Sequence, residues 1–166
     1  LIVALQAPLW ASGAPDEARF DDPFAYCAAV GTIDAPDARY TGPVLPEAVA
    51  RGLRAAVNAP ADAPLEPLLG NSIWRCMDGR VYACTVGANL PCGEKADART
   101  APSAALRESC RHNPDADGVP MVVTGRATVF EWRCAGERPT IVRQIAQPDA
   151  AGYLAHIWYP IEPATP

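Results

Sequence analysis

The sequence has few of the residues and spacings that most catalytic and metal sites require. It contains only two histidines, no Gly-x-Ser-x-Gly elbow, no His-Glu-x-x-His pair and no Gly-rich phosphate loop. A zinc site in a chain with two histidines would need cysteine ligands, yet no Cys-x-x-Cys spacing occurs. The familiar enzyme signatures are therefore excluded, and we expect no metal and no cofactor.

Basic residues and long apolar runs are also scarce. The formal charge is −5 at pH 7, with 14 Lys and Arg against 19 Asp and Glu, whereas nucleic-acid-binding proteins usually carry a basic stripe. No apolar run approaches the roughly 20 residues that a membrane-spanning helix needs. We therefore expect no nucleic-acid partner and a chain that is not embedded in a membrane.

The first residues are apolar and are followed by small residues and then by acids. This order resembles the apolar and cleavage regions of a secretory signal peptide, and the run from Leu1 to Ala11 is too short to span a bilayer. We expect residues 1–14 to be the remnant of such a peptide. An ordinary apolar strand or helix at the start of the domain would give the same pattern.

The cysteine content agrees with export. An even number of cysteines in an exported chain predicts disulfides, which persist in oxidising compartments. We therefore expect a secreted or periplasmic bacterial protein. The six cysteines are Cys27, Cys76, Cys84, Cys92, Cys110 and Cys134.

The pairing of the cysteines is only partly constrained by the sequence. If Asp78-Gly79 is a two-residue hairpin loop, Cys76 lies opposite Val81 while Cys84 faces the other side of the sheet. A Cys76–Cys84 bond is then disfavoured. Cys92 and Cys110 flank a predicted helix and are a candidate pair.

Eighteen prolines and twelve glycines divide the chain into short elements. The patterns predict an α+β domain over residues 15–161, with an antiparallel sheet of about five strands packed with two or three helices. The strands are a hairpin plus a three-stranded meander, and we expect the tail, residues 162–166, to be frayed. Helices are expected at 22–30, 46–57 and 102–111, and strands at 72–76, 80–84, 124–134, 140–147 and 153–161.

The stretch Ser109–Gly118 (SCRHNPDADG) combines a thiol, a histidine and the start of a calcium-loop pattern. Asn113, Asp115 and Asp117 match the first ligand positions of such a loop, but the twelfth position falls on Thr124, which cannot supply two carboxylate oxygens. We therefore interpret the stretch as a helix end followed by a turn. We expect Cys110 to be oxidised.

Aromatic and arginine side chains gather in the predicted strands. Trp-Arg-Cys occurs twice, at 74–76 and 132–134, each time before a glycine turn. Strand alternation puts each Trp and Cys on one face and the Arg on the other. Two interpretations stay open: a duplicated half-site that presents Arg75 and Arg133 side by side, or core Trp and Cys residues with solvated arginines.

These patterns define the candidate ligand-binding residues. Stacked aromatics with interspersed arginines suit a sugar, a peptidoglycan fragment or a protein partner. The same aromatics would equally fill a core against helices that supply mostly Ala and Val. The candidates are Trp74, Arg75, Tyr82, Trp132, Arg133 and His156.

Residues 74–82 (WRCMDGRVY) resemble the aromatic-x-Cys-x-x-Gly hairpins of small periplasmic C-type lysozyme inhibitors. The resemblance covers nine of 166 residues and implies an inhibitor of a cell-wall hydrolase on a β-barrel. The helix-rich first half and the long insertion between hairpins depart from that family.

Three functional hypotheses follow from the sequence. The first is a non-catalytic binding or interaction module in the periplasm. The second is the inhibitor implied by the resemblance. The third is a hydrolase or transferase with an unfamiliar carboxylate or Cys/His site, built around Cys92, His112 or His156.

Overall fold

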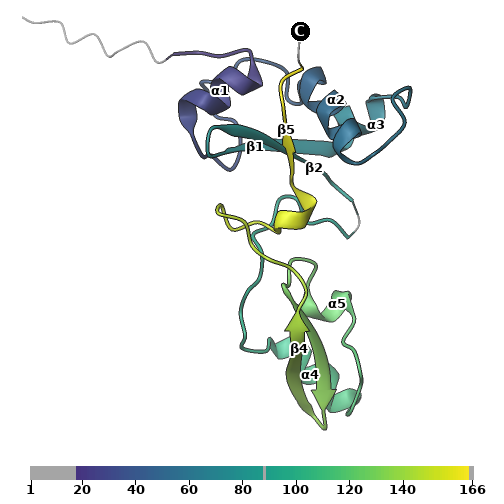
Figure 1. Ribbon diagram of the computed structural model, residues 1–166. Coiled ribbons are helices and arrows are strands. Elements are labelled where there is room, and N and C mark those ends of the chain that lie inside the picture. The colour runs from purple at the N-terminus through teal and green to yellow at the C-terminus, as the bar shows by residue number, and fades with distance from the viewer. Residues whose placement is uncertain (1–17, 88, 165–166) are drawn as a thin grey trace, which may run out of the picture.

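The computed structural model describes residues 18–87 and 89–164, so the expected signal remnant, residues 1–14, lies outside the described residues. Short helices and antiparallel strands confirm the α+β class and the five strands. The strands form a three-stranded and a two-stranded sheet (Figure 1). We call the regions around them the three-stranded part (18–85 and 155–164) and the two-stranded part (96–146).

Helix α1 (Pro23–Val30) begins at the predicted cap. Asp22 Oδ1 accepts a hydrogen bond from the Ala25 N–H at 2.7 Å, and Pro23 occupies the first turn, where its missing N–H costs nothing. The helix buries Tyr26 and Cys27, and Tyr26 packs edge-to-face on Trp74.

Helix α2 (Glu47–Ala56) is the amphipathic helix that the apolar stripe predicts. It buries Val49, Ala50 and Leu53, which share one face at helical spacing. Helix α3 (Glu66–Asn71) follows at the end of the proline-rich connector and was not predicted. None of its residues is fully buried, but the half-buried Leu68 packs against the apolar core of the three-stranded part.

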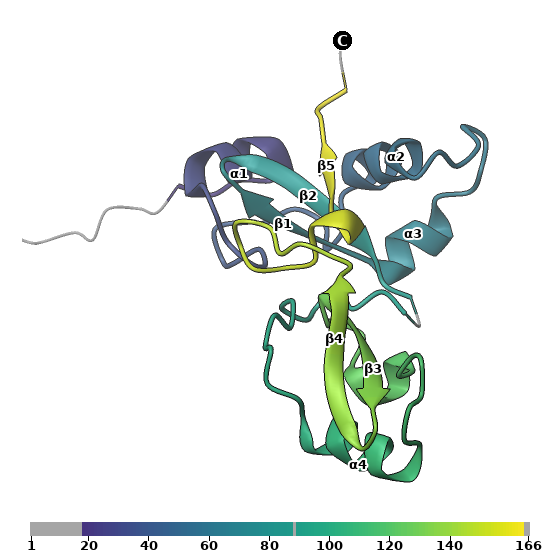
Figure 2. The same ribbon diagram turned by 60° about the horizontal axis from the view of Figure 1, so that its bottom comes forward.

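The three-stranded sheet has the order β1-β2-β5, with β1 (Ser72–Met77), β2 (Arg80–Thr85) and β5 (Tyr159–Ile161) all antiparallel. Asp78 and Gly79 join β1 to β2 with φ angles of 52° and 76°, the two positive values that a type I′ turn requires. Cys76 therefore pairs with Val81, as predicted. Strand β5 runs between α1 and α2 (Figures 1 and 2).

The two-stranded sheet pairs β3 (Phe130–Ala135) with β4 (Arg138–Gln144), and α4 (Ala104–His112) packs against it (Figure 2). Ser103 caps α4 by accepting a hydrogen bond from the Leu106 N–H at 3.1 Å. A four-residue helix, α5 (Met121–Thr124), precedes β3. The single turn η1 (Ala155–Ile157) precedes β5.

The predicted meander is wrong in one connection. β3 and β4 pair as expected, but the third strand is shorter and joins β2 in the other sheet. The chain after β4 leaves the hairpin and crosses to the three-stranded part, where Ile161 enters the first core cluster. The tail that we expected to fray begins at Glu162, which forms an ion pair with Arg80.

All six cysteines form disulfides, which confirms the predicted oxidation of Cys110. The expectation that Cys76 does not bond to Cys84 is confirmed. The candidate pair Cys92–Cys110 is wrong, because Cys92 lies near the end of β2 and α4 packs on the other sheet. The observed bonds are Cys27–Cys76, Cys84–Cys92 and Cys110–Cys134.

Two apolar clusters hold the fold. The first joins α1, α2 and the three-stranded sheet around Tyr26, Leu53 and Trp74. The second lies where the two parts meet. The Cys84–Cys92 disulfide ties β2 to the loop that follows it, and Val129, just before β3, packs in the same cluster. Its buried members are Cys84, Cys92, Val129, Tyr153, Leu154, Ile157 and Trp158.

Candidate functional site

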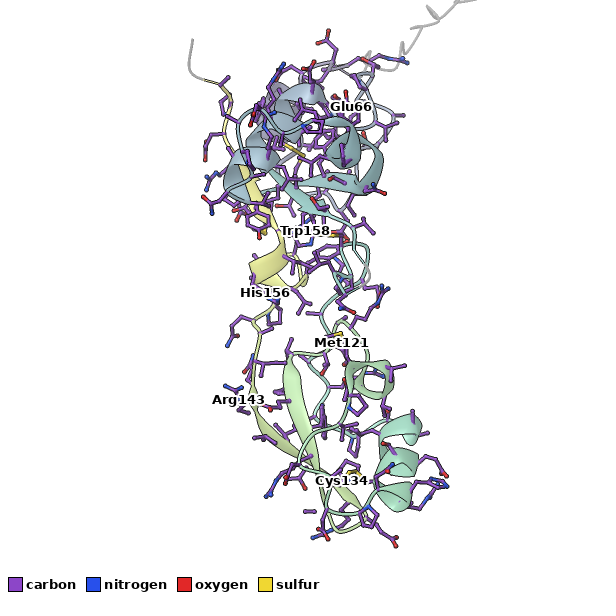
Figure 3. All side chains as sticks on the ribbon, turned by 90° about the vertical axis from the view of Figure 1, so that its right-hand side faces the viewer. Glu66, Met121, Cys134, Arg143, His156 and Trp158 are labelled. Carbon is purple, nitrogen blue, oxygen red and sulfur yellow. A yellow bond between two sulfur atoms is a disulfide. The ribbon has the colours of Figure 1, made fainter. Side chains whose placement is uncertain are left out.

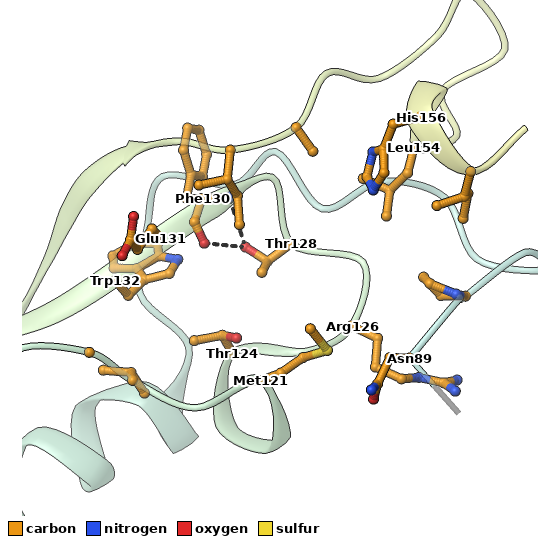
Figure 4. Close-up of a pocket in the computed structure, with 16 residues that line it drawn as sticks. Asn89, Met121, Thr124, Arg126, Thr128, Phe130, Glu131, Trp132, Leu154 and His156 are labelled. Carbon is orange, nitrogen blue, oxygen red and sulfur yellow. Dashed lines mark hydrogen bonds between the residues drawn. The ribbon is translucent and has the colours of Figure 1, made fainter. Parts of the chain in front are cut away.

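A cavity of about 310 Å³ lies at the waist between the two parts. One wall comes from α5 and the start of β3, and the other from η1 and the segment before it (Figure 4). Figure 3 shows His156 and Met121 facing this waist from the two parts. The cavity is at the lower end of the range of small-molecule pockets, about 300–1,000 Å³.

One side of the cavity wall is apolar and aromatic. Phe130 and Trp132 contact edge-to-face, with ring centroids 6.4 Å apart, and Val119, Ile145 and Leu154 also line the cavity. Trp132 is held in place from behind, since its carbonyl accepts a hydrogen bond from the Val119 N–H at 2.9 Å. This wall can take an apolar ring or a branched side chain.

Polar groups stand at the edge of the cavity. The Thr128 hydroxyl is bound locally, because it accepts a hydrogen bond from the Phe130 N–H at 3.2 Å. His156 is exposed and lines the cavity. Its imidazole forms no hydrogen bond or ion pair with any residue in 18–87 or 89–164, so it is available to a ligand.

The charged residues of the rim are joined in ion pairs. Arg126 binds Glu94 at 2.6 Å, and Arg143 binds Glu131 at 2.5 Å. These pairs leave the mouth close to neutral while keeping it polar.

The backbone just before β3 is paired with the segment at Asp97, near the start of the two-stranded part. The Asp97 N–H donates to the Ala127 carbonyl at 2.7 Å, and the Val129 N–H donates to the Asp97 carbonyl at 3.0 Å. The Arg99 guanidinium, hydrogen-bonded to the Asp97 carboxylate, lowers the pKa of Asp97 below its ordinary value of 3.8.

Arg75, a predicted site residue, lies in a closed cage next to the second apolar cluster. Its side chain is 0% exposed and forms an ion pair with Asp149. Its guanidinium carbon lies 4.4 Å from the ring centroid of Trp158, 4.5 Å from that of Tyr153 and 5.7 Å from that of Tyr82. These are cation–π distances, so the cage fixes the segment around Asp149 to β1.

The structure separates the predicted site residues. Trp74 is buried and donates its indole N–H to the Val44 carbonyl at 2.8 Å. Arg133 is exposed on the other sheet, so it does not lie beside Arg75. Trp132 and His156 are brought together as two of the residues that line the cavity.

Several residues of the cavity were missed by sequence reasoning. Met121, Thr124, Phe130 and Ile145 come from a four-residue helix and two strand ends. Local patterns carry no signal for their convergence with η1. The one hint in the sequence is the short apolar run at 121–123, which no amphipathic period explains.

The stretch 109–118 ends α4 and supports the β3–β4 turn. Asp115 Oδ1 accepts a hydrogen bond from the Gly136 N–H at 2.7 Å, and the Asp115 N–H donates to the Gly136 carbonyl at 3.3 Å. His112 is exposed beside Glu108. Within the described ranges, no group of three or more His, Cys, Asp or Glu is arranged to hold a metal ion.

Comparison of the chain with models of protein families, with curated proteins and with solved structures finds no match. Over residues 18–87 and 89–164, no helix is both long and apolar enough to cross a membrane. The function must therefore be argued from the site itself.

Proposed function

We propose that the protein is a secreted, disulfide-stabilised binding module whose waist cavity holds the apolar group of a ligand. The observation that carries the proposal is a cavity lined both by the aromatic pair Phe130 and Trp132 and by His156, whose imidazole has no partner among the described residues. Such a combination buries an apolar body and orients it with one polar contact.

The rim of the cavity supports the same function. Two large apolar side chains that are exposed, Met121 at 46% and Ile145 at 53%, line the cavity. Apolar side chains that line a cavity give the apolar part of a ligand a surface to contact.

Binding accounts for the site better than catalysis. Cys92 is held in a disulfide and supplies no thiol nucleophile. A catalytic histidine is normally oriented by a hydrogen-bonded carboxylate or carbonyl, and His156 has no such partner among the described residues. The Thr128 hydroxyl already accepts a hydrogen bond from the Phe130 N–H.

The inhibitor hypothesis has no support in the geometry. Trp74 and Arg75 carry the resemblance to lysozyme inhibitors, and both side chains are buried. The tip of their hairpin packs on α1, where the Gly79 N–H donates to the Gly31 carbonyl at 2.9 Å.

A neutral apolar dye, N-phenyl-1-naphthylamine, tests the proposal, because its emission rises when it leaves water. We expect saturable binding of one dye molecule per chain. Met121→Glu should weaken binding by about tenfold or more, since it places a charge in the apolar wall. Val142→Glu is the matched control: both side chains are 46% exposed, but Val142 does not line the cavity.

Two results would contradict the proposal. One is the absence of saturable dye binding to the unmutated protein. The other is an equal loss of binding in the two variants. The secreted location is tested separately, by recovering the protein from a periplasmic extract of the producing bacterium with no thiol open to alkylation.

A further inference from the structure

The solvent face of the β3–β4 hairpin is basic, although the whole chain has a net charge of −5. Alternation along β3 puts Glu131 and Arg133 on one face. Arg133 pairs with Thr140 across the sheet, so Arg138 also lies on this face. Arg133, Arg138 and Thr140 on this face are exposed, and Ala135, opposite Arg138, is half-buried.

Two arginines of this face have no partner within the part of the chain that the structure describes. Glu131 and Arg143 neutralise each other in an ion pair of 2.5 Å. Arg133 and Arg138 form no hydrogen bond or ion pair with the described part of the chain. The face therefore carries two unpaired positive charges, each able to bind a carboxylate with two parallel hydrogen bonds.

The basic face meets the waist cavity at the start of β3. Glu131 lies on the basic face and also lines the cavity, whereas Phe130 and Trp132 line the cavity from the opposite face of the strand. Successive same-face residues of a strand are roughly 7 Å apart, so Arg133 lies one such step beyond the cavity wall. Arg138 pairs with Ala135 and lies about one step further, on the neighbouring strand. An extended peptide has the same spacing between alternate side chains.

The face, and not the free edge of β4, is the surface suited to a partner. Strand β4 carries Pro139, and the register of the hairpin shifts between Glu131 and Trp132. A proline and a bulge both discourage another strand from adding to an edge. A segment that lies across the face avoids both obstacles.

We propose that the ligand is an extended acidic segment of a partner protein. One apolar side chain of the segment enters the cavity, and carboxylates about two and four residues away bind Arg133 and Arg138. This inference rests on the proposed function, because the cavity supplies the anchor. Charge complementarity with the two unpaired arginines selects an acidic segment over a neutral or basic one.

The test uses a fluorescein-labelled nonapeptide with a central leucine, aspartates two and four residues away on both sides, and serines between them. Its symmetry makes the chain direction immaterial. The control peptide has asparagine at the four acidic positions. We expect the acidic peptide to bind about tenfold more tightly, from two exposed ion pairs, and to displace the apolar dye from the cavity.

Two charge-matched double variants locate the surface. Arg133→Gln with Arg138→Gln should abolish the preference for the acidic peptide and leave dye affinity unchanged. Arg19→Gln with Arg107→Gln removes the same charge from exposed sites elsewhere and should leave the preference intact. Polygalacturonate, a polyanionic polysaccharide, serves as the competitor of another class.

Each contrary outcome has a separate meaning. Equal affinity for the two peptides, no peptide binding, or equal behaviour of the two double variants overturns the acidic-segment inference while dye binding still supports the cavity. Polygalacturonate that binds through Arg133 and Arg138 without displacing the dye also overturns it, in favour of a polysaccharide. Loss of dye binding by the unmutated protein removes the proposed function as well.

Discussion

The buried ion pair between Arg75 and Asp149 gives the sharpest stability prediction. The Arg75 side chain is 0% exposed and that of Asp149 is 8% exposed, so neither charge can turn to water. Asp149→Asn removes one charge and leaves the other buried without a counter-charge. Breaking a buried pair in this way costs about 3–5 kcal/mol, and we expect a value near the lower limit because the aromatic cage still faces the guanidinium.

Removal of the arginine instead of the aspartate should lower the free energy of unfolding by less. In Arg75→Met an apolar chain of similar length replaces the guanidinium. Asp149 keeps the backbone N–H groups of Ala151 and Tyr153, which donate to its Oδ1 at 2.9 and 3.0 Å. The double variant then has no uncompensated buried charge. The double variant should therefore lose about 1–3 kcal/mol less free energy of unfolding than the sum of the losses in the two single variants.

Urea unfolding of the four proteins, followed by tryptophan fluorescence, measures this coupling. Trp158 stacks on Arg75 and reports directly on the cage. Glu162→Gln breaks the exposed Arg80–Glu162 pair and should leave the unfolding midpoint unchanged. Two results would refute the account of the cage. One is a double variant whose loss of unfolding free energy equals the sum of the two single losses, and the other is an Asp149→Asn variant as stable as the parent.

Three further predictions concern the two-stranded part. The pKa of Asp97 lies below 3.8 in the folded state, so its carboxylate stabilises the fold at neutral pH. This contribution is lost as the pH falls below 3.8. In a measurement of unfolding free energy against pH, Asp97→Asn should therefore flatten the decrease at acid pH. Replacing Cys110 and Cys134 by serine opens a 24-residue loop and should cost about 3 kcal/mol in urea unfolding; an unchanged midpoint would contradict this. Asp115→Ala removes the hydrogen bond to Gly136 and should cost about 1 kcal/mol, with metal content unchanged by elemental analysis.

Local rules account for the elements that the sequence predicted correctly. Asp22 caps α1 with its own side chain, and Asp78-Gly79 closes the β1–β2 hairpin through two positive φ angles. Each feature depends on residues within a few positions of one another. The expected register of Cys76 with Val81 followed from the turn alone.

Long-range pairing accounts for what the sequence did not predict. Strand β5 joins β2 although about 75 residues separate them, because Ile161 completes a core cluster that short-range patterns do not describe. Arg75 follows strand alternation, but the face that we expected to be solvated is covered by the Asp149 segment. No pattern near Arg75 predicts a carboxylate 74 positions away.

The same reason explains why only part of the candidate site was predicted. Trp132 was selected for its place in the repeated Trp-Arg-Cys pattern and His156 for its place in the last predicted strand, and the fold brings both to the cavity. Arg133 was expected beside Arg75, but it lies on the exposed face of the other sheet. Whether Arg133 binds a ligand stays a prediction, which the peptide experiment tests.

An NMR titration of the tryptophan indole N–H signals with the apolar dye tests the central claim most directly. Trp132 lines the cavity, whereas Trp74 is buried in the first apolar cluster with its N–H bonded to the Val44 carbonyl. A ligand in the waist cavity should shift the Trp132 signal in a saturable manner and leave the Trp74 signal in place. An unmoved Trp132 signal at saturating dye would contradict the account.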